Sequence, residues 1–246
     1  MTKSKVTLTL FLLFATACTG MPPTPNVTAV VCDISTSSEC DNSVIREALQ
    51  DFMFSSPPSG STMEVWIIGC DIADVRKVFE IEVPHSWGTG VTARRRAWQV
   101  SQKERIASFR LPDRVSCSGI AAGIFKAASV LHEREGVNRH LWLVSDLREV
   151  SELADFERKI PTPRKFVTAL RNASLLPDLK GIHVDVCRVH DHATPDVPRW
   201  TAKKSRALKE AWSAAFAAMN ISEVTLKEKC VWEGTGKTTT PIAVIP

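Results

Sequence analysis

The stretch that decides the fold is Val30-Val31-Cys32-Asp33-Ile34-Ser35-Thr36-Ser37, an apolar run that ends in an acid followed by hydroxyls at alternate positions. Residues 27–31 are rich in β-branched side chains, which is typical of a strand covered on both faces, and such strands belong to parallel sheets flanked by helices. Because ligands of open α/β sheets bind at the carboxyl ends of the strands, we expect Asp33 at the functional edge of the sheet. Its carboxylate and the hydroxyls of Ser35 and Ser37 supply part of the oxygen shell of a hard divalent cation, so the other ligands must come from distant loops.

Strand-like and helix-like patterns alternate along the rest of the chain, which indicates an α/β fold. We predict a doubly wound, mostly parallel sheet of about six strands, with helices on both faces and an antiparallel edge strand. The expected strands are 27–31, 64–70, 78–83, 139–145, 182–189 and 224–226. The expected helices begin at Asn42 or Ser43, within 91–110, at Ser118, near Pro163 and at Pro198.

Three short stretches resemble the loops of the metal-ion-dependent adhesion site of von Willebrand factor A domains. They are Asp33-x-Ser35-x-Ser37, Cys117-Ser118-Gly119-Ile120-Ala121-Ala122-Gly123-Ile124 and Leu141-Trp142-Leu143-Val144-Ser145-Asp146. In the second stretch, Ser118 stands where the family places a metal-coordinating Thr at the opening of a helix. The third resembles the strand that ends in Ser-Asp-Gly, with Leu147 in place of the Gly, so we expect this loop to turn differently.

The resemblance implies a metal site in which the two acids act largely through bound waters. Its ion would be Mg²⁺, with Mn²⁺ or Ca²⁺ as alternatives, and a protein partner would complete the coordination with an acidic residue. The residues that the resemblance assigns to the metal are Asp33, Ser35, Ser37, Ser118 and Asp146.

Two of these residues also have a purely structural interpretation. Ser118, or Ser116 beside it, is suited to cap the helix that follows by satisfying its free amides. Asp146 is equally suited to cap a short helix through residues 151–153. For Ser118 both roles can hold, because a capping hydroxyl can also contact a cation. For Asp146 the metal interpretation is favoured, because two carboxylates that converge on one edge of a sheet repel each other and attract a cation or a proton.

The amino terminus reads as a lipoprotein signal, residues 1–17, with Lys3 and Lys5 before an apolar segment that is too short to span a bilayer. The sequence Ala15-Thr16-Ala17-Cys18 resembles the bacterial lipobox, which implies cleavage before Cys18 and a lipid on its sulfur. The alternative is a simple secretory peptide that is cut nearby. Thr19 follows the cysteine, which implies the outer membrane, facing the periplasm. We then expect a flexible tether at 18–26, one domain at 27–232 and a tail at 233–246.

Six cysteines remain when Cys18 is set aside, an even number that is compatible with three disulfides in an exported chain. Their pairing cannot be read from the sequence alone. The strand order of the resembled family implies a pair between Cys187 and Cys230 and a pair of Cys40 with Cys70 or Cys117. In the alternative, Cys32 and Cys70 are small buried apolar side chains without a disulfide.

Charge and polar clusters restrict the classes of partner. With a formal net charge of +4, the chain is not basic enough to argue for nucleic acid. The basic residues of the 94–105 segment are expected to form a solvated helix face, although an anionic surface or an acidic partner would also suit them. His190-Asp191-His192 could bind zinc, but a polar loop is the favoured interpretation.

The sequence therefore predicts a membrane-anchored binding module that engages a protein through a divalent cation. The alternative is a scaffold lipoprotein of an envelope or secretion assembly in which the metal site has decayed. An enzyme that uses Asp33 and Asp146 with an ion for hydrolysis is not expected, because the sequence has no nucleophile-and-base pair and no phosphate-cradling glycine loop. The oligomeric state is left open.

Overall fold

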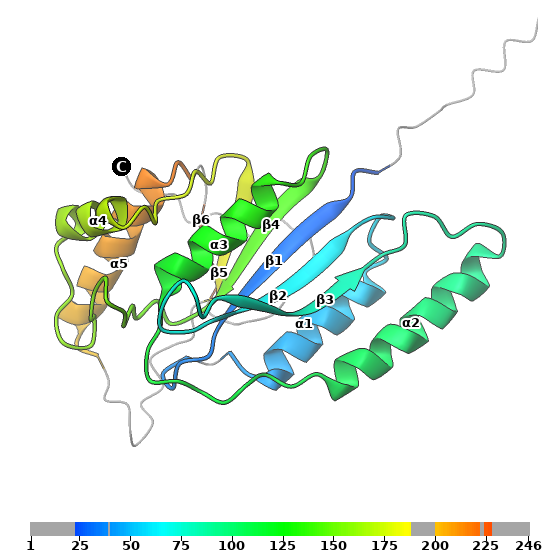
Figure 1. Ribbon diagram of the computed structural model, residues 1–246, viewed down its shortest axis with the longest axis horizontal. Coiled ribbons are helices and arrows are strands. Elements are labelled where there is room, and N and C mark those ends of the chain that lie inside the picture. The colour runs from blue at the N-terminus through cyan, green and yellow to red at the C-terminus, as the bar shows by residue number, and fades with distance from the viewer. Residues whose placement is uncertain (1–22, 39, 188–199, 222–223, 228–246) are drawn as a thin grey trace, which may run out of the picture.

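The fold is seen in a computed structural model of the chain that describes residues 23–38, 40–187, 200–221 and 224–227 (Figure 1). Each predicted strand and helix has a counterpart in it. The strands are β1 (Asn26–Asp33), β2 (Thr62–Ile68), β3 (Arg76–Glu82), β4 (Asn138–Val144), β5 (Ile182–Cys187) and β6 (Val224–Lys227). The helices in these residues are α1 (Asn42–Phe54), α2 (Val91–Ser108), α3 (Ile120–His132), α4 (Pro163–Asn172) and α5 (Ala202–Ala218).

The strands form one six-stranded sheet in the order β3-β2-β1-β4-β5-β6. β3 pairs antiparallel with β2, and the other neighbours are parallel. The predicted mostly parallel sheet with an antiparallel edge strand is therefore confirmed. The order reverses between β1 and β4, so the carboxyl ends of these two strands form the switch point at which ligands of such sheets bind.

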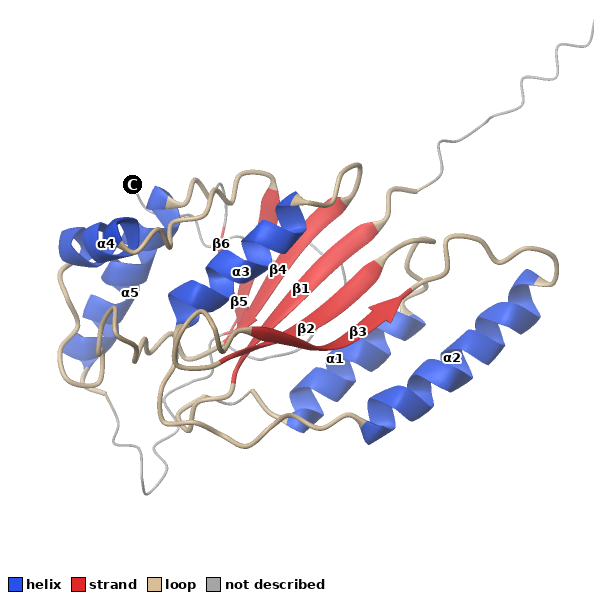
Figure 2. Ribbon diagram, in the orientation of Figure 1, coloured by secondary structure: helices blue, strands red, loops and turns tan. Residues whose placement is uncertain are grey.

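Helices cover both faces of the sheet, as predicted (Figure 2). On one face, α3, α4 and α5 bury alternate strand residues such as Val31 and Leu143. On the other face, α1 and α2 pack with Val30 and its neighbours. Within α3, a Cβ atom on Gly123 would lie 2.7 Å from Ile68 Cγ1, so a small residue is needed for the start of this helix to approach the sheet.

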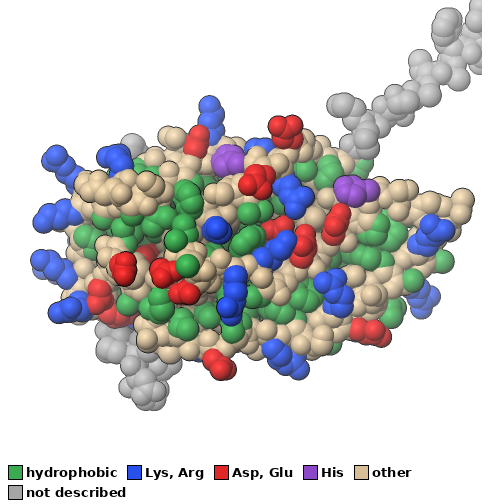
Figure 3. Space-filling view, viewed as in Figure 1, with side chains coloured by type: hydrophobic (Ala, Val, Ile, Leu, Met, Phe, Trp, Pro, Cys, Tyr) green, Lys and Arg blue, Asp and Glu red, His purple; other side chains and the backbone are tan. Residues whose placement is uncertain are grey.

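The start of α1 differs from the prediction by a residue or two, whereas the basic helix has the solvated face that was expected. Asp41 caps α1, and its carboxylate accepts hydrogen bonds from the backbone N–H groups of Ser43 and Val44, so the predicted cap at Asn42 or Ser43 was wrong by one residue or two. Helix α2 buries few residues, and the basic side chains of the 94–105 segment lie mostly in solvent. On the face in Figure 3, Lys and Arg side chains are spread out and do not merge into one patch.

Two disulfides are seen in the described residues, and they correct the predicted pairing. Cys32 bonds to Cys40, with their Cα atoms 5.6 Å apart, and Cys70 bonds to Cys117, with Cα atoms 5.0 Å apart. The predicted bond of Cys40 to Cys70 or Cys117 was wrong, and so was the interpretation of Cys32 and Cys70 as free thiols. Cys187 is disulfide-bonded as well.

Several predictions fall outside the described residues: the signal segment with Cys18, the cluster His190-Asp191-His192, Cys230 as partner of Cys187, and the tail at 233–246. Among the residues that are described, no helix combines the length and the apolar character that a membrane crossing requires.

Candidate metal centre

Three loops meet at the carboxyl ends of β1 and β4. We name them the first loop (residues 33–38), the second loop (115–119) and the third loop (145–151). The second loop lies between the other two, because its residues exchange backbone hydrogen bonds with both. Val115 pairs with the first loop through Thr36 N–H, at 3.1 Å, and Ser118 exchanges two hydrogen bonds of 2.8 and 2.9 Å with Val150 of the third loop.

The two disulfides hold these loops in place. The bond between Cys32 and Cys40 closes the first loop on the end of β1. The bond between Cys70 and Cys117 fixes the second loop to the segment that follows β2. Both covalent links therefore restrain loops that carry predicted metal ligands.

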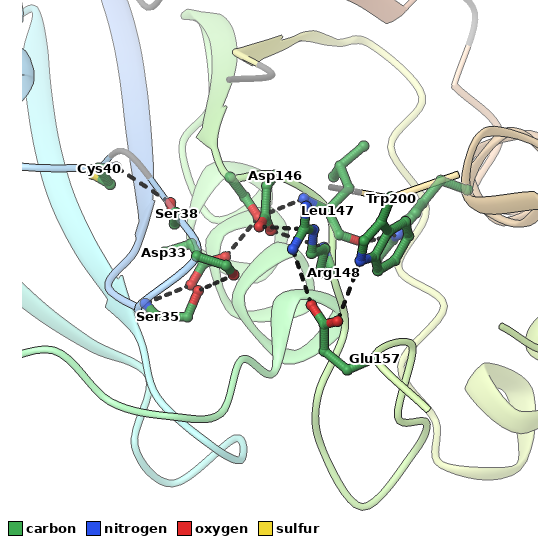
Figure 4. A network of polar contacts seen from close by, with 12 residues as sticks. Asp33, Ser35, Ser38, Cys40, Asp146, Leu147, Arg148, Glu157 and Trp200 are labelled. Carbon is green, nitrogen blue, oxygen red and sulfur yellow. Dashed lines mark hydrogen bonds and ion pairs between the residues drawn. The ribbon is translucent and has the colours of Figure 1, made fainter. Parts of the chain in front are cut away.

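Asp33 is fully buried at the end of β1. Its Oδ1 accepts a hydrogen bond of 2.9 Å from the backbone N–H of Ser35, and its Oδ2 accepts one of 2.7 Å from the hydroxyl of Ser145 (Figure 4). Burial, and then the negative charge of Asp146, raise the pKa of Asp33 to about 6. The two predicted acids are thus close enough for each to disfavour the ionised form of the other.

Asp146 lies near the hydroxyls of the first loop. The Ser37 hydroxyl is close enough to the Asp146 carboxylate to lower its pKa, and it lies 3.4 Å from the Ser35 hydroxyl. Burial raises the pKa of Asp146 above its usual value, although the N–H of Arg148 and the hydroxyl of Ser37 oppose this in part. The capping interpretation of Asp146 was wrong, because residues 147–153 form no helix.

Ser118 is the predicted ligand of the second loop, and its hydroxyl has no hydrogen-bond partner although it is buried. The capping interpretation fails here as well, because Gly119 occupies the N-cap position of α3 and no side chain of that position caps the helix. A buried hydroxyl without a partner is costly, so this oxygen is the kind of atom that a cation would satisfy.

Glu149 accepts a hydrogen bond from a free backbone N–H at the start of α3, a role that the sequence did not indicate. Its Oε2 accepts a hydrogen bond of 3.0 Å from Ala121 N–H, 28 positions away in the chain, and Ser151 donates to its other oxygen. Burial raises the pKa of Glu149 to about 7, and the charge of Asp33 adds to the shift. A third buried acid therefore lies beside the two predicted ones.

Arg148 is the second residue that sequence reasoning missed. Its Nε lies 3.3 Å from Asp146 Oδ2, and its Nη1 lies 3.2 Å from Glu157 Oε1 (Figure 4). The guanidinium carbon stacks 4.5 Å from the ring centroid of Trp200, whose Nε1 donates to Glu157. This arginine is as buried as the acid, so the protein itself supplies one positive charge to the third loop.

The third loop accommodates Leu147 in a conformation that glycine prefers. Its φ of 66° is in the left-handed region. The backbone is held there from both sides: Leu147 N–H donates to the Ser145 hydroxyl at 3.0 Å, and Trp212 Nε1 of α5 donates to the Leu147 carbonyl at 2.8 Å. Its side chain is buried in the core, which offsets the cost of the strained backbone.

The donor set fits a hard divalent cation. All five predicted ligands offer oxygen, two of them are buried acids that repel each other, and one is a buried hydroxyl without a partner. Three buried carboxylates, those of Asp33, Asp146 and Glu149, lie here. The third loop contributes one guanidinium, that of Arg148, as a counter-charge. When the acids are ionised, a further positive charge would lower their repulsion.

Comparisons with known proteins find similarity at the level of the backbone. No family model matches the chain, and no curated protein matches it. An aerotolerance-related membrane protein from Bacteroides fragilis is 14% identical with a TM-score of 0.41, over 83% of this chain and 90% of that one. The pilus adhesin SpaC from Lactobacillus rhamnosus GG is 10% identical with a TM-score of 0.48, over 85% of this chain and 29% of that one. The manganese-loaded TRAP protein of Plasmodium vivax is 11% identical with a TM-score of 0.36, over 66% and 56%.

Proposed function

We propose that this protein binds a protein partner through a divalent cation at the edge formed by the three loops. Asp33, Ser35, Ser37, Ser118 and Asp146 hold the ion, which is Mg²⁺ or, in its place, Mn²⁺ or Ca²⁺. Three of these ligands are neutral hydroxyls, so the bound ion keeps enough positive field to attract an acidic residue of the partner. The lipid on Cys18 anchors the module to the outer membrane, where it faces the periplasm. The role is binding and not catalysis.

One observation carries this proposal: the buried, unpartnered hydroxyl of Ser118 is tied by backbone hydrogen bonds to the loop of Asp146. A hydroxyl with a capping role would have a backbone partner, and a decayed site has no need to bury one without a partner. The raised pKa values of Asp33 and Asp146 support the proposal as well, because burial is the main cause of both shifts and a bound cation would offset the cost of ionising these buried carboxyls.

The test is metal binding to the purified protein, by calorimetry and by thermal shift with Mg²⁺ and Mn²⁺. We expect one saturable site in the wild type and none in Asp33→Asn, which keeps the shape of the side chain. The exposed Asp113, close to the second loop, supplies the matched control Asp113→Asn, which should bind as the wild type does. Partners are then captured from envelope extracts with Mg²⁺ and with a chelator. A folded wild type that binds neither ion contradicts the proposal.

Arg148 favours a second candidate function, a scaffold that works without metal. Its guanidinium already pairs with the Asp146 carboxylate, so the protein carries its own counter-charge at the third loop. In that case partner binding in an envelope or secretion assembly would survive a chelator and the Asp33→Asn substitution. The same capture experiment separates the two functions.

A further inference from the structure

A cluster of two histidines and an acid lies on the sheet, away from the three loops. His140 of β4 and His183 of β5 are register partners on adjacent parallel strands, and Asp185 follows two residues later on β5. Side chains two residues apart point to the same face of a sheet. The neighbours Trp142 and Cys187 place this face on the side of α1 and α2.

The distances within the cluster suit a shared metal ion. His140 Nε2 lies 3.0 Å from Asp185 Oδ2, and His183 Nε2 lies 3.5 Å from Asp185 Oδ1. One ligand atom from each residue falls within 4.8 Å of the others. Around a tetrahedral zinc ion with bonds of about 2.0–2.1 Å, ligand atoms are roughly 3.3 Å apart. The three side chains therefore need little rearrangement to bind one ion.

The surroundings also suit a metal. His140 and Asp185 have side chains only 6% exposed, whereas that of His183 is 53% exposed, so the cluster is largely buried and reaches solvent at His183. On β1, Thr28 is the register partner of His140, and its buried Oγ1 makes no hydrogen bond. A water bound to a metal ion in this cluster would offer a polar partner in the neighbourhood of this hydroxyl.

We propose that His140, His183 and Asp185 form a zinc site that joins β4 to β5. Imidazole nitrogens select zinc and other transition ions over Mg²⁺, whereas the oxygen ligands of the three loops select hard ions. His140 lies four residues before the end of β4, or about 13 Å along the strand, so the zinc site is separate from the edge that carries Asp33. The side chains of the cluster supply three of the four ligands of a tetrahedral zinc ion, and a further ligand such as water completes the set. The ion stabilises the sheet by linking adjacent strands.

The experiment measures Zn²⁺ affinity of the full-length protein by competition with a chromophoric chelator, with Co²⁺ absorption as a second readout of the ligand set. We expect one zinc ion per chain, a tetrahedral Co²⁺ spectrum, and a melting temperature that rises with zinc. His183→Gln and Asp185→Asn should each weaken zinc binding at least about tenfold. The first variant changes a half-exposed side chain and should fold, as circular dichroism would verify.

Two controls make the outcome decisive. His85→Gln alters another exposed histidine that neighbours an acid, at 3.3 Å from Glu82, and should bind zinc as the wild type does. Asp33→Asn should also keep its zinc, since it changes the other site. Zinc that stays bound in folded His183→Gln with unchanged affinity, or that is lost in Asp33→Asn, would overturn the assignment. A wild type that binds no zinc would do the same.

Discussion

The guanidinium of Arg148 lies 3.3 Å from the carboxylate of Asp146, and both side chains are buried. An internal cation thus occupies one side of an acid that we assign to a divalent ion. The pair explains how the loop can fold when no metal is bound, because a buried carboxylate without a counter-charge would be strongly disfavoured. It also means that the metal and the arginine share one acid.

Replacing Arg148 by Met should make the fold depend on metal. Loss of one partner of a buried ion pair leaves the other charge uncompensated, so we expect a loss of about 3 kcal/mol of unfolding free energy in the presence of a chelator. Saturating Mg²⁺ should restore part of this loss, because the ion replaces the missing charge beside Asp146. Urea unfolding with and without Mg²⁺ measures both effects, and the exposed Arg158→Met serves as the control. No recovery with Mg²⁺ would favour the metal-free scaffold.

The substitution Ser118→Ala separates a metal ligand from a structural serine. The hydroxyl has no hydrogen-bond partner, so its removal should leave the stability without metal unchanged or raise it by up to about 1 kcal/mol. Mg²⁺ affinity should fall about tenfold. Ser145→Ala is the matched comparison, because that hydroxyl donates to Asp33 and accepts from Leu147 N–H, and its loss should cost about 2–3 kcal/mol. If Ser118→Ala were the more destabilising of the two, the assignment of the hydroxyl would be wrong.

The disulfide that contributes more to stability should be the one that contributes less to metal binding. The Cys70–Cys117 bond spans 47 residues and the Cys32–Cys40 bond spans 8, so chain entropy predicts losses of about 4 and about 2.5 kcal/mol when each pair is replaced by serines. Loss of the Cys32–Cys40 bond should lower the Mg²⁺ affinity more than loss of the Cys70–Cys117 bond, because the short disulfide holds the loop of Asp33, Ser35 and Ser37. Denaturation and calorimetry on both double variants provide the comparison. An equal loss of affinity in both would show that the short disulfide does not order the site.

Much of this architecture could be predicted because it depends on local patterns. The apolar run before Asp33 and its two alternate hydroxyls indicate a buried strand and a functional loop, and the alternation of such strands with helices indicates a mostly parallel sheet. The acids at the ends of β1 and β4 could be predicted to lie close together, because adjacent parallel strands end at the same edge of the sheet. The hydrogen bond from Ser145 to Asp33 is the result.

The parts that were missed depend on contacts between distant residues. The cap of α3 comes from Glu149 on another loop, so a search for a capping residue near Ser118 could not find it. The pairing of Cys32 with Cys40 depends on the path by which the first loop folds back, which no periodicity reports. The histidine cluster depends on the register of β4 and β5. His140 and His183 are 43 positions apart in the chain, and they become neighbours only because these two strands align them.

Glu149 should make the stability of the metal-free protein fall as the pH rises. Its pKa is about 7 in the folded protein against an ordinary value of 4.5, so the folded state holds a proton that the unfolded state has lost. The contribution of Glu149 to stability is therefore fully present below about pH 4.5 and is lost as the pH rises through 7, by an amount on the order of 3 kcal/mol. Asp33, with a pKa raised to about 6, adds a decline of the same sign over a lower range.

Urea unfolding between pH 4.5 and pH 8 in the presence of a chelator measures this decline in stability. Glu149→Gln should remove roughly half of the decline, because the amide keeps the shape of the side chain but has no proton to lose. The exposed Glu152→Gln is the control and should follow the wild type. Added Mg²⁺ should flatten the wild-type curve above pH 6, because the ion favours the ionised acids. Equal slopes of stability against pH in the wild type and Glu149→Gln would mean that this buried acid does not retain its proton in the folded state. A wild-type stability curve that Mg²⁺ leaves unchanged would argue that no cation binds beside Asp33.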